Sequence, residues 1–256
     1  MYSASFFRKS FPDWKKKRDP IMVKLVYRPI SFYFAAFFAN LKMSGNDVSV
    51  LSAFVGISAC ILFLFNNYTC GIIAAIIVNI WIIMDCTDGN IARSVKAIPY
   101  GDFLDSTSCY ILVGILFNVL GYRAYQSSSL FFSGKIFIVL LGALTASFDS
   151  ITRLVYQRYL VSSYNLGINE KVESDITKVS TLQKIRLIID LNIGIGGFFP
   201  LILLLSIFFS FLDIVVIGYF LYYGFFAMVS ISFLTFKALK KGNKLSQELN
   251  VDNQEG

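Results

Sequence analysis

Three aspartates, an arginine and two glycines stand at fixed spacings from Asp85 to Asp105, at the junction of two otherwise apolar segments. Asp85 directly follows the run 71–84, which holds no charge and only one strongly polar side chain, Asn79. A carboxylate at the centre of a membrane helix costs roughly 2.5–3.5 kcal/mol. We therefore expect cations to neutralise this cluster, and we interpret the cluster as the functional centre.

The spacing predicts that the carboxylates converge. Asp85 and Asp88 are three residues apart and share one face of a helix. Asp105 and Cys109 are four residues apart and share a face of the next helix, which the short connection 94–100 makes an antiparallel neighbour. Converging carboxylates cannot all stay ionised without counter-charge. Mg²⁺ and Mn²⁺ prefer oxygen ligands, and Mg²⁺ in proteins is usually shared with a substrate phosphate, so the pattern favours a phosphate ester as partner.

Two neighbours of the aspartates fit the same chemistry. Gly89 lets a flat group approach the backbone, and Arg93 offers a planar fork for a phosphate. The alternative is a helix end that reaches water, with an Asp/Arg pair stabilising two helices. The full pattern, with both glycines and Asp105 in register, favours the functional interpretation.

The string D-x2-D-G-x2-A-R-x7-G-x3-D, from Asp85 to Asp105, resembles the signature of the CDP-alcohol phosphatidyltransferase family. Weaker likenesses are found at 28–31 and 44–48, which resemble the family's entry to the first span, and at 150–153 on the fourth span. The resemblance implies an N-terminal interfacial helix, six spans and a site that faces the cytoplasm. It also implies phosphotransferase activity in phospholipid synthesis.

By that resemblance, Asp85, Asp88 and Asp105 bind one or two Mg²⁺ or Mn²⁺ ions, which hold the pyrophosphate of a CDP-linked alcohol. The acceptor hydroxyl would attack the β-phosphoryl group, and CMP would leave. The donor would be CDP-diacylglycerol or another CDP-alcohol, and the sequence does not name the acceptor alcohol. The family commonly forms homodimers. Residues expected around the nucleotide and phosphates are Asn46, Gly89, Ala92, Arg93 and Gly101.

The signature departs from the family at Cys109, where the resemblance expects a fourth aspartate as general base and second-metal ligand. A thiol is a poor replacement, because its pKa is about 8.5 and its sulfur is a soft ligand. Three alternatives stay open. In the first, the enzyme works with a weaker second-metal site and takes its base from water, the substrate or Asp102. In the second, the protein is a slow or inactive relative that still binds CDP-alcohol. In the third, Cys109 was introduced into an otherwise ordinary enzyme.

Arg153 and Asp149 are four residues apart near the inner end of the fourth predicted span. The simpler interpretation, which we slightly favour, is an ion pair within the helix. The functional interpretation places Arg153 against the phosphate or carboxylate of the acceptor. Asp190 and Asn192 either close the same cavity or bond between helices.

The composition predicts an integral membrane protein, since 56% of the 256 residues are hydrophobic and 26 are phenylalanine. The segment 29–40 is too short to span and is expected to be an interfacial helix. The six predicted spans are 47–66, 69–93, 101–122, 133–159, 185–212 and 214–238. We therefore divide the chain into a basic N-terminal region (1–46), an all-α transmembrane catalytic domain (47–240) and a polar tail (241–256).

Basic residues predict the orientation. With six spans, 21 of the 23 lysines and arginines lie on one side, and only Arg123 and Lys135 lie on the other. The positive-inside rule then places both termini and the aspartates on the cytoplasmic side of the membrane. If the source is bacterial, this is the cytoplasmic membrane. The net charge of +7 is explained by this topology and by contact with anionic lipid, so we expect no nucleic-acid partner.

The remaining features carry less weight. The four cysteines show no metal-finger spacing and are expected to be free thiols, and there is no histidine to act as a base.

The glycines in 194–197 are expected to form a helix-packing surface within a span. A non-catalytic binding protein and a cation transporter were also considered. The transporter is disfavoured because the acids lie near one membrane surface and no related halves are visible.

Overall fold

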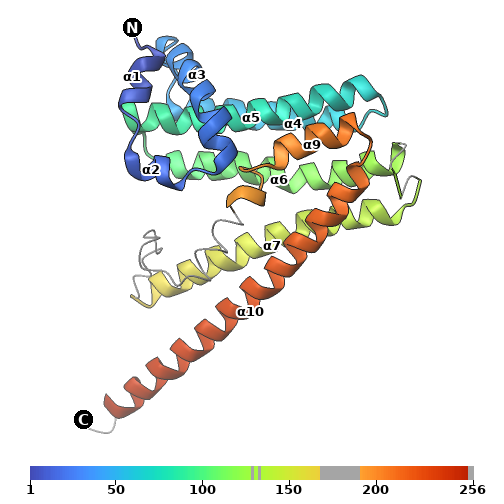
Figure 1. Cartoon of the computed structure of the whole chain (residues 1–256). Helices are drawn as coiled ribbons and strands as arrows, with labels where there is room; N and C mark the ends of the chain where they lie inside the picture. Colours follow the sequence, from blue (N-terminus) through green and yellow to red (C-terminus); the bar gives the residue numbers. More distant parts are fainter. Residues whose placement is uncertain (128–129, 132–133, 168–190, 253–256) are drawn as a thin grey trace.

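Every secondary-structure element that the structure describes is a helix. The computed structural model describes residues 1–127, 130–131, 134–167 and 191–252 (Figure 1). The elements are α1 (Ala4–Lys9), α2 (Asp13–Arg18), the π-helical turn η1 (Val23–Tyr27), α3 (Arg28–Asn40), α4 (Gly45–Phe63), α5 (Tyr68–Ser94), α6 (Gly101–Gln126), α7 (Phe137–Asn165), α9 (Phe199–Phe208) and α10 (Leu212–Asp252). The expected all-α fold is confirmed.

Five helices are long and apolar enough to cross a membrane. They are α4, α5, α6, α7 and the part of α10 over Leu212–Asn243. They coincide with five of the six predicted spans and identify a multi-pass integral membrane protein. The residues from 241 on, expected as a polar tail, continue α10 as helix to Asp252 because they are rich in good helix formers such as Leu, Lys, Gln and Glu.

The predicted fifth span, 185–212, is described only from residue 191, so the count of six is not established. Within the described part, a turn over 194–198 separates a short helical stretch from the ten-residue α9. The Phe198 amide donates to the Asn192 carbonyl at 2.7 Å, and the backbone at Gly197 runs so close to that carbonyl that a Cβ would not fit. The expectation that these glycines form a helix-packing surface was therefore wrong, because they form a turn.

Local sequence fixes where the long helices begin. Ser44 and Asp47 form a reciprocal capping box at the start of α4, in which the Asp47 amide donates to Ser44 Oγ at 3.2 Å and the Ser44 amide donates to Asp47 Oδ2 at 2.8 Å. Asn67 caps α5 by accepting the Cys70 amide hydrogen at 3.2 Å. The chain turns into α6 at Tyr100, which has a left-handed φ of 65°. α4 packs against both α5 and α6, whereas α5 and α6, expected to be direct neighbours, make little contact with each other.

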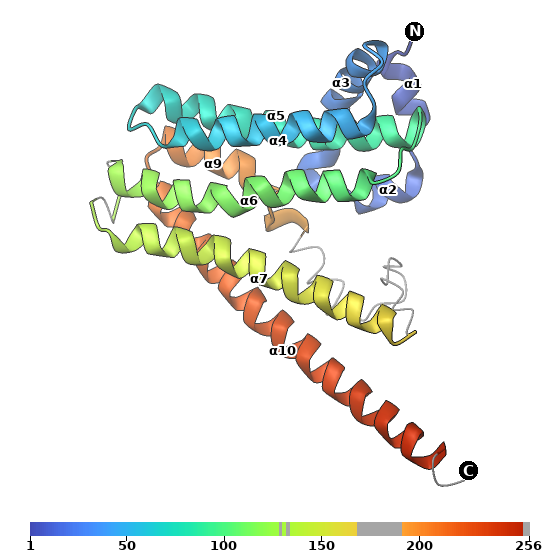
Figure 2. The same ribbon diagram turned by 180° about the vertical axis from the view of Figure 1, so that it is seen from behind.

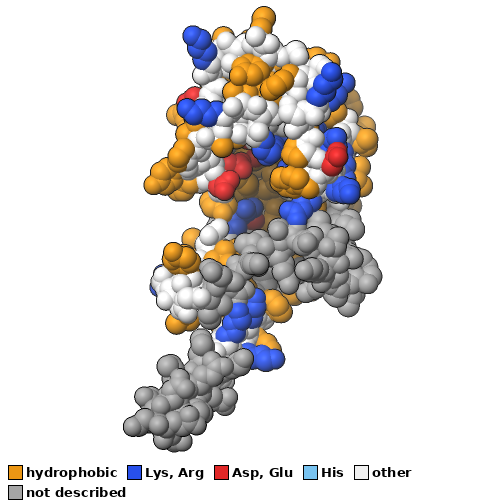
Figure 3. Space-filling view, turned by 90° about the vertical axis from the view of Figure 1, so that its left-hand side faces the viewer, with side chains coloured by type: hydrophobic (Ala, Val, Ile, Leu, Met, Phe, Trp, Pro, Cys, Tyr) orange, Lys and Arg blue, Asp and Glu red, His pale blue; other side chains and the backbone are white. Residues whose placement is uncertain are grey.

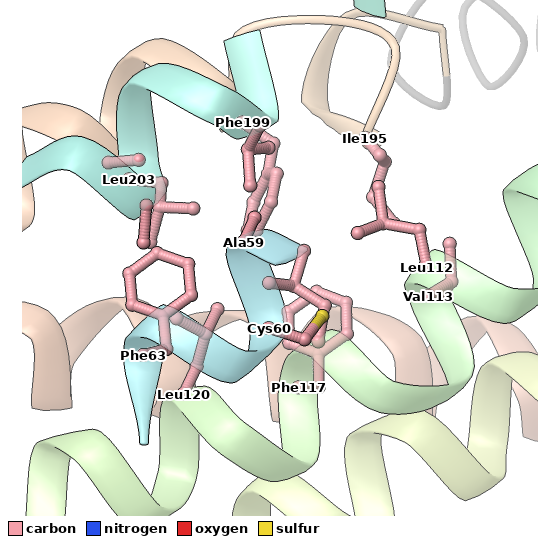
Figure 4. Packing of buried hydrophobic residues seen from close by; sticks show 14 of the residues in the cluster. Ala59, Cys60, Phe63, Leu112, Val113, Phe117, Leu120, Ile195, Phe199 and Leu203 are labelled. Carbon is pink, nitrogen blue, oxygen red and sulfur yellow. The ribbon is translucent and has the colours of Figure 1, made fainter. Parts of the chain in front are cut away.

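The core of the bundle lies between α4, α5, α6 and α9. Figure 4 shows side chains from three of these helices meeting, among them Phe63, Phe117 and Phe199. The rings of Phe117 and Phe199 have centroids 5.4 Å apart. All three phenylalanines are fully buried, and helices in a membrane associate through close van der Waals packing of this kind. This packing holds the helices that carry the aspartates.

The N-terminal helices cover one end of the bundle, next to the carboxyl end of α5, whereas α10 crosses α7 obliquely and ends far from the N-terminus (Figures 1 and 2). The expected helix 29–40 is observed as α3, with Phe32 and Ala35 buried and Tyr33 and Phe37 exposed. Its seat in the membrane interface stays a prediction. The Tyr27 hydroxyl, in η1, donates to Asn79 Oδ1 at 2.6 Å, and burial raises the pKa of Tyr27 to about 12. This contact fixes the N-terminal segment to α5.

Candidate functional site

The three predicted metal ligands come together at the end of the bundle that the N-terminal helices cover. Asp85 and Asp88 lie in the last turns of α5, and Asp105 lies in the first turns of α6. The carboxyl groups of Asp85, Asp88 and Asp105 lie near enough to interact electrostatically with one another. The convergence predicted from helix periodicity is observed.

The donor set suits a hard cation. None of the three aspartates forms an ion pair with a lysine or arginine in the described part of the chain. Their oxygens are the ligands that Mg²⁺ and Mn²⁺ prefer. Within the described ranges, however, no three acidic, cysteine or histidine side chains are already gathered at ligand distance from one point. The residues fit a divalent cation by chemistry, and the metal-binding role stays a proposal.

Ser49 supports Asp88 from the neighbouring helix. Its hydroxyl lies on α4 and donates to Asp88 Oδ2 at 2.6 Å, and both side chains are buried. Sequence reasoning missed Ser49, although it follows the capped start of α4 by one turn. Its hydrogen bond fixes one carboxylate oxygen and orients the other, as the outer-shell partner of a metal ligand does.

Arg93 folds back over Gly89. An ideal Cβ built on Gly89 would lie 2.7 Å from Arg93 Nη2, so any side chain there would displace the guanidinium. Arg93 Nη2 also lies 3.5 Å from Asn90 Oδ1, at the limit for a hydrogen bond, and the guanidinium faces the ring of Phe11 at 5.9 Å. The absence of a side chain at residue 89 therefore sets the position of the arginine that is predicted to meet the phosphate.

These residues line a cavity of about 350 Å³ between α4, α5 and α6. Asn46 joins the α5–α6 connection to α4, because its Nδ2 donates to the Pro99 carbonyl at 3.1 Å. The structure thus brings every predicted nucleotide-site residue to one cavity with two of the aspartates. The lining comprises Gly45, Asn46, Ser49, Asp88, Gly89, Ala92, Arg93, Ala97, Gly101, Asp102 and Asp105, and we call it the first cavity.

A second cavity, of about 390 Å³, lies on the other side of the aspartates. Asp85 lines it together with Cys109, so Cys109 does not share the first cavity with Asp88 and Asp105. The turn that replaced the predicted helix contributes Gly194, Ile195 and Gly196 to its wall. Figure 3 views this end of the molecule and shows a hollow between the helices with acidic and basic side chains at its rim.

Arg153 lines the second cavity and also pairs with Asp149. Arg153 Nε donates to Asp149 Oδ2 at 2.6 Å, which confirms the ion pair that the sequence favoured. The guanidinium also faces the ring of Tyr110 at 5.1 Å. Because both charged groups line the cavity, the pair itself forms part of its wall. Asp190, which was expected nearby, lies outside the described residues.

A buried ion pair that sequence reasoning missed connects the N-terminal segment to the site. Arg28 forms a bidentate contact with Asp19, with Nε–Oδ2 at 2.8 Å and Nη2–Oδ1 at 3.1 Å. Its Nη1 donates to the Cys86 carbonyl at 3.0 Å and to Asn90 Oδ1 at 3.2 Å. Burial alone would lower the pKa of the Arg28 guanidinium, but the interactions with Cys86, Asp19 and Asp85 raise it. The only signal in the sequence was the weak likeness at 28–31.

All four cysteines are free, as expected. Cys60 and Cys86 are buried, whereas Cys70 and Cys109 are partly accessible. Cys109 is therefore the thiol that reaches the site, and Cys86, between two aspartates, contributes its carbonyl to the contact with Arg28.

A family model described as CDP-alcohol phosphatidyltransferase matches residues 43–212, which is more than half of the chain. The chain therefore belongs to the CDP-alcohol phosphatidyltransferase family, and a phosphotransferase of this kind is the class of protein that the fold and the site define. The comparison with curated proteins gave no match. The matched region runs from just before α4 to the first residue of α10. It includes most of the residues that line the two cavities; the others lie on α10 and in the N-terminal segment.

Proposed function

We propose that the protein transfers a substituted phosphate group from a CDP-linked alcohol to an acceptor alcohol and releases CMP. The expected donor is CDP-diacylglycerol. The observation that carries this proposal is the position of the aspartates between two cavities: Asp88 and Asp105 line the first and Asp85 lines the second. Two substrates could thus approach one group of carboxylates from opposite sides.

The first cavity suits the nucleotide and the pyrophosphate. Asn46 and Arg93 offer polar donors, and Gly89 and Gly101 leave room for a flat group near the backbone. Asp85, Asp88 and Asp105 would hold one or two Mg²⁺ or Mn²⁺ ions, whose positive charge would offset that of the pyrophosphate during transfer. Ser49 keeps Asp88 oriented for this role.

The second cavity suits the acceptor. Arg153 and Asp149 give its wall one charge of each sign, which can orient a polar alcohol. In the proposed reaction the acceptor oxygen forms a bond with the β-phosphorus, and the bond from that phosphorus to the CMP oxygen breaks. CMP leaves with the bonding electrons, and the hydroxyl proton passes to a base. Positioning and charge neutralisation supply most of the catalysis in such transfers.

A second candidate is a catalytically impaired relative that binds CDP-alcohol and metal. The observation that favours it is Cys109, which lines the acceptor cavity where the family resemblance expects an aspartate. Asp102 lines the first cavity with Asp105 and is the carboxylate that could replace the missing base. Loss of a general base typically lowers a rate by 10²–10⁴-fold, so binding could survive while turnover is slow.

We also propose that the aspartates face the cytoplasm and that the protein forms homodimers, as the family commonly does. The orientation is supported by the basic helix α2, which lies at the aspartate end, and by Lys15, whose charge acts on Asp105. Thiol labelling from each side of sealed vesicles, with single cysteines placed on α2 and in 134–136, tests the orientation. Labelling of α2 from the outside would contradict it.

One assay tests the proposed reaction. Purified protein with Mg²⁺ or Mn²⁺, CDP-diacylglycerol and a panel of acceptor alcohols is expected to release CMP only when metal and acceptor are both present. Asp85→Asn is the matched control, because it keeps the size of the side chain and removes the charge. If CDP-diacylglycerol binds but no alcohol yields CMP, the impaired relative is the correct assignment. If CMP appears equally with Asp85→Asn, the site is wrongly assigned.

A further inference from the structure

A third polar cavity lies at the opposite end of the bundle from the aspartates. It has a volume of about 250 Å³ and forms where the α4–α5 turn, the end of α6 and the α9–α10 turn meet. Its lining residues are Asn66, Tyr68, Arg123, Ser127, Ser206, Ile207, Ser210 and Leu212. None of them belongs to the proposed active site, and we call this space the distal cavity.

Arg123 lies in the wall of the distal cavity and is buried, with 4% of its surface exposed. Its Nη1 donates to the Phe65 carbonyl and its Nη2 donates to the Asn67 carbonyl at 2.9 Å. The guanidinium packs against Gly71, where an added Cβ would lie 3.2 Å from Nη2. The third nitrogen, Nε, is buried and has no hydrogen-bond partner among the described residues. One donor of a buried arginine is therefore left unsatisfied.

Among the described residues, the charge of Arg123 is also uncompensated. No described carboxylate forms an ion pair with it. Asp213 adjoins the cavity in sequence, but its Oδ2 accepts the Phe131 amide hydrogen at 2.8 Å and its side chain is not part of the lining. Water could satisfy the hydrogen bond of Nε, yet it would leave the buried charge without a counter-ion, which is unfavourable.

The surroundings of Arg123 favour a negative ligand. The first turn of α5 begins at Tyr68, so the positive end of that helix dipole lies at the cavity. Asn66, Tyr68 and Ser210 are exposed at its mouth and carry hydrogen-bond donors. A cavity with a buried cation, a helix amino terminus and several donors has the chemistry of an anion site.

We propose that the distal cavity binds a phosphate-bearing anion, with the guanidinium of Arg123 as its counter-charge. Such an anion has two sources. One is the head group of an anionic lipid in the leaflet opposite the aspartates, and the other is free inorganic phosphate. The mouth residues lie at the ends of membrane-spanning helices, where a lipid head group can reach them.

The test uses the purified full-length protein in EDTA, which suppresses metal-dependent binding at the aspartates. Calorimetric titration with dihexanoylphosphatidylglycerol and, separately, with inorganic phosphate is expected to show saturable binding of at least one of them. Asn66→Asp adds a carboxylate at the mouth and should weaken binding by about tenfold or more, because like charges then meet in the complex. Asn66→Gln, which adds no charge, should retain wild-type affinity within about threefold.

Arg123→Gln retains a polar amide donor and removes the charge, so it should abolish saturable binding. If that variant does not fold, the difference in affinity between Asn66→Asp and Asn66→Gln still tests the proposal. Binding of the lipid alone would identify a lipid site, and binding of phosphate alone would identify a free-anion site. If neither probe binds the wild type, or if Asn66→Asp binds as tightly as the wild type, the proposal is overturned.

Discussion

The hydroxyl of Ser49 on α4 donates a 2.6 Å hydrogen bond to the carboxylate of Asp88 on α5. Outer-shell partners of this kind typically contribute 10–100-fold to metal affinity. We therefore expect Ser49→Ala to weaken Mn²⁺ binding by about 10–100-fold, as measured by calorimetric titration. Ser58→Ala is the matched control, because Ser58 lies on the exposed face of α4 and its hydroxyl donates only to the Val55 carbonyl of its own helix. Equal affinities for the two variants would remove Ser49 from the site.

Gly89 carries a second prediction. Gly89→Ala would place a Cβ 2.7 Å from Arg93 Nη2 and push the guanidinium out of position. A misplacement of about 1 Å can cost about 10²-fold in rate, so the rate of CMP release should fall by roughly that factor. Gly114→Ala, on α6, meets nothing within 4 Å and serves as the control. Unchanged activity in Gly89→Ala would mean that the observed position of Arg93 is not required.

The buried pair of Arg28 and Asp19 predicts an effect on stability. Arg28→Ala removes the bidentate partner of the buried Asp19 carboxylate and leaves it only Lys15, at 3.6 Å; breaking a buried pair typically costs about 3–5 kcal/mol, which the contact with Lys15 offsets in part. The thermal unfolding midpoint in detergent should fall markedly. Asp13→Asn, which breaks the exposed pair of Asp13 and Lys16, should leave the midpoint unchanged. A similar midpoint for both variants would show that the N-terminal segment does not stabilise the site.

The convergence of the aspartates could be predicted from the sequence, because helix periodicity and a short connection determine which faces meet. Asp85, Asp88 and Asp105 are in proximity for that reason. Asn46, which was expected from the family resemblance, lines the first cavity with Asp88 and Asp105. The family resemblance pointed to the remaining nucleotide-site residues. Five spans were also predictable, since long apolar runs are the strongest signal of a membrane helix.

Features that depend on tertiary contacts were missed. Asp19 and Arg28 belong to a basic segment in which no local pattern indicates a buried pair. The glycines of 194–197 were misinterpreted because a glycine cluster in an apolar run is equally compatible with helix packing and with a turn. The Gly197 backbone lies so close to the Asn192 carbonyl that the segment must turn there, and this contact cannot be recognised from the sequence.

Cys109 separates the two proposed functions. If the missing carboxylate limits turnover, Cys109→Asp should raise the rate of CMP release by about 10²–10⁴-fold and leave the affinity for CDP-diacylglycerol nearly unchanged. Cys109→Ala is the control. If the missing carboxylate is what limits turnover, the thiol takes no part in catalysis, and this variant should release CMP at the wild-type rate. A large loss of activity in Cys109→Ala would instead identify the thiol as a participant in catalysis.

The central claim is that the three aspartates bind a CDP-linked alcohol through divalent metal. Calorimetric titration of CDP-diacylglycerol into the purified protein, with Mn²⁺ and again with EDTA, tests this claim most directly. We predict saturable binding that requires Mn²⁺ and disappears in Asp85→Asn, while that variant still unfolds at the wild-type temperature. Equal affinity in EDTA, or wild-type affinity in Asp85→Asn, would contradict the assignment of the site.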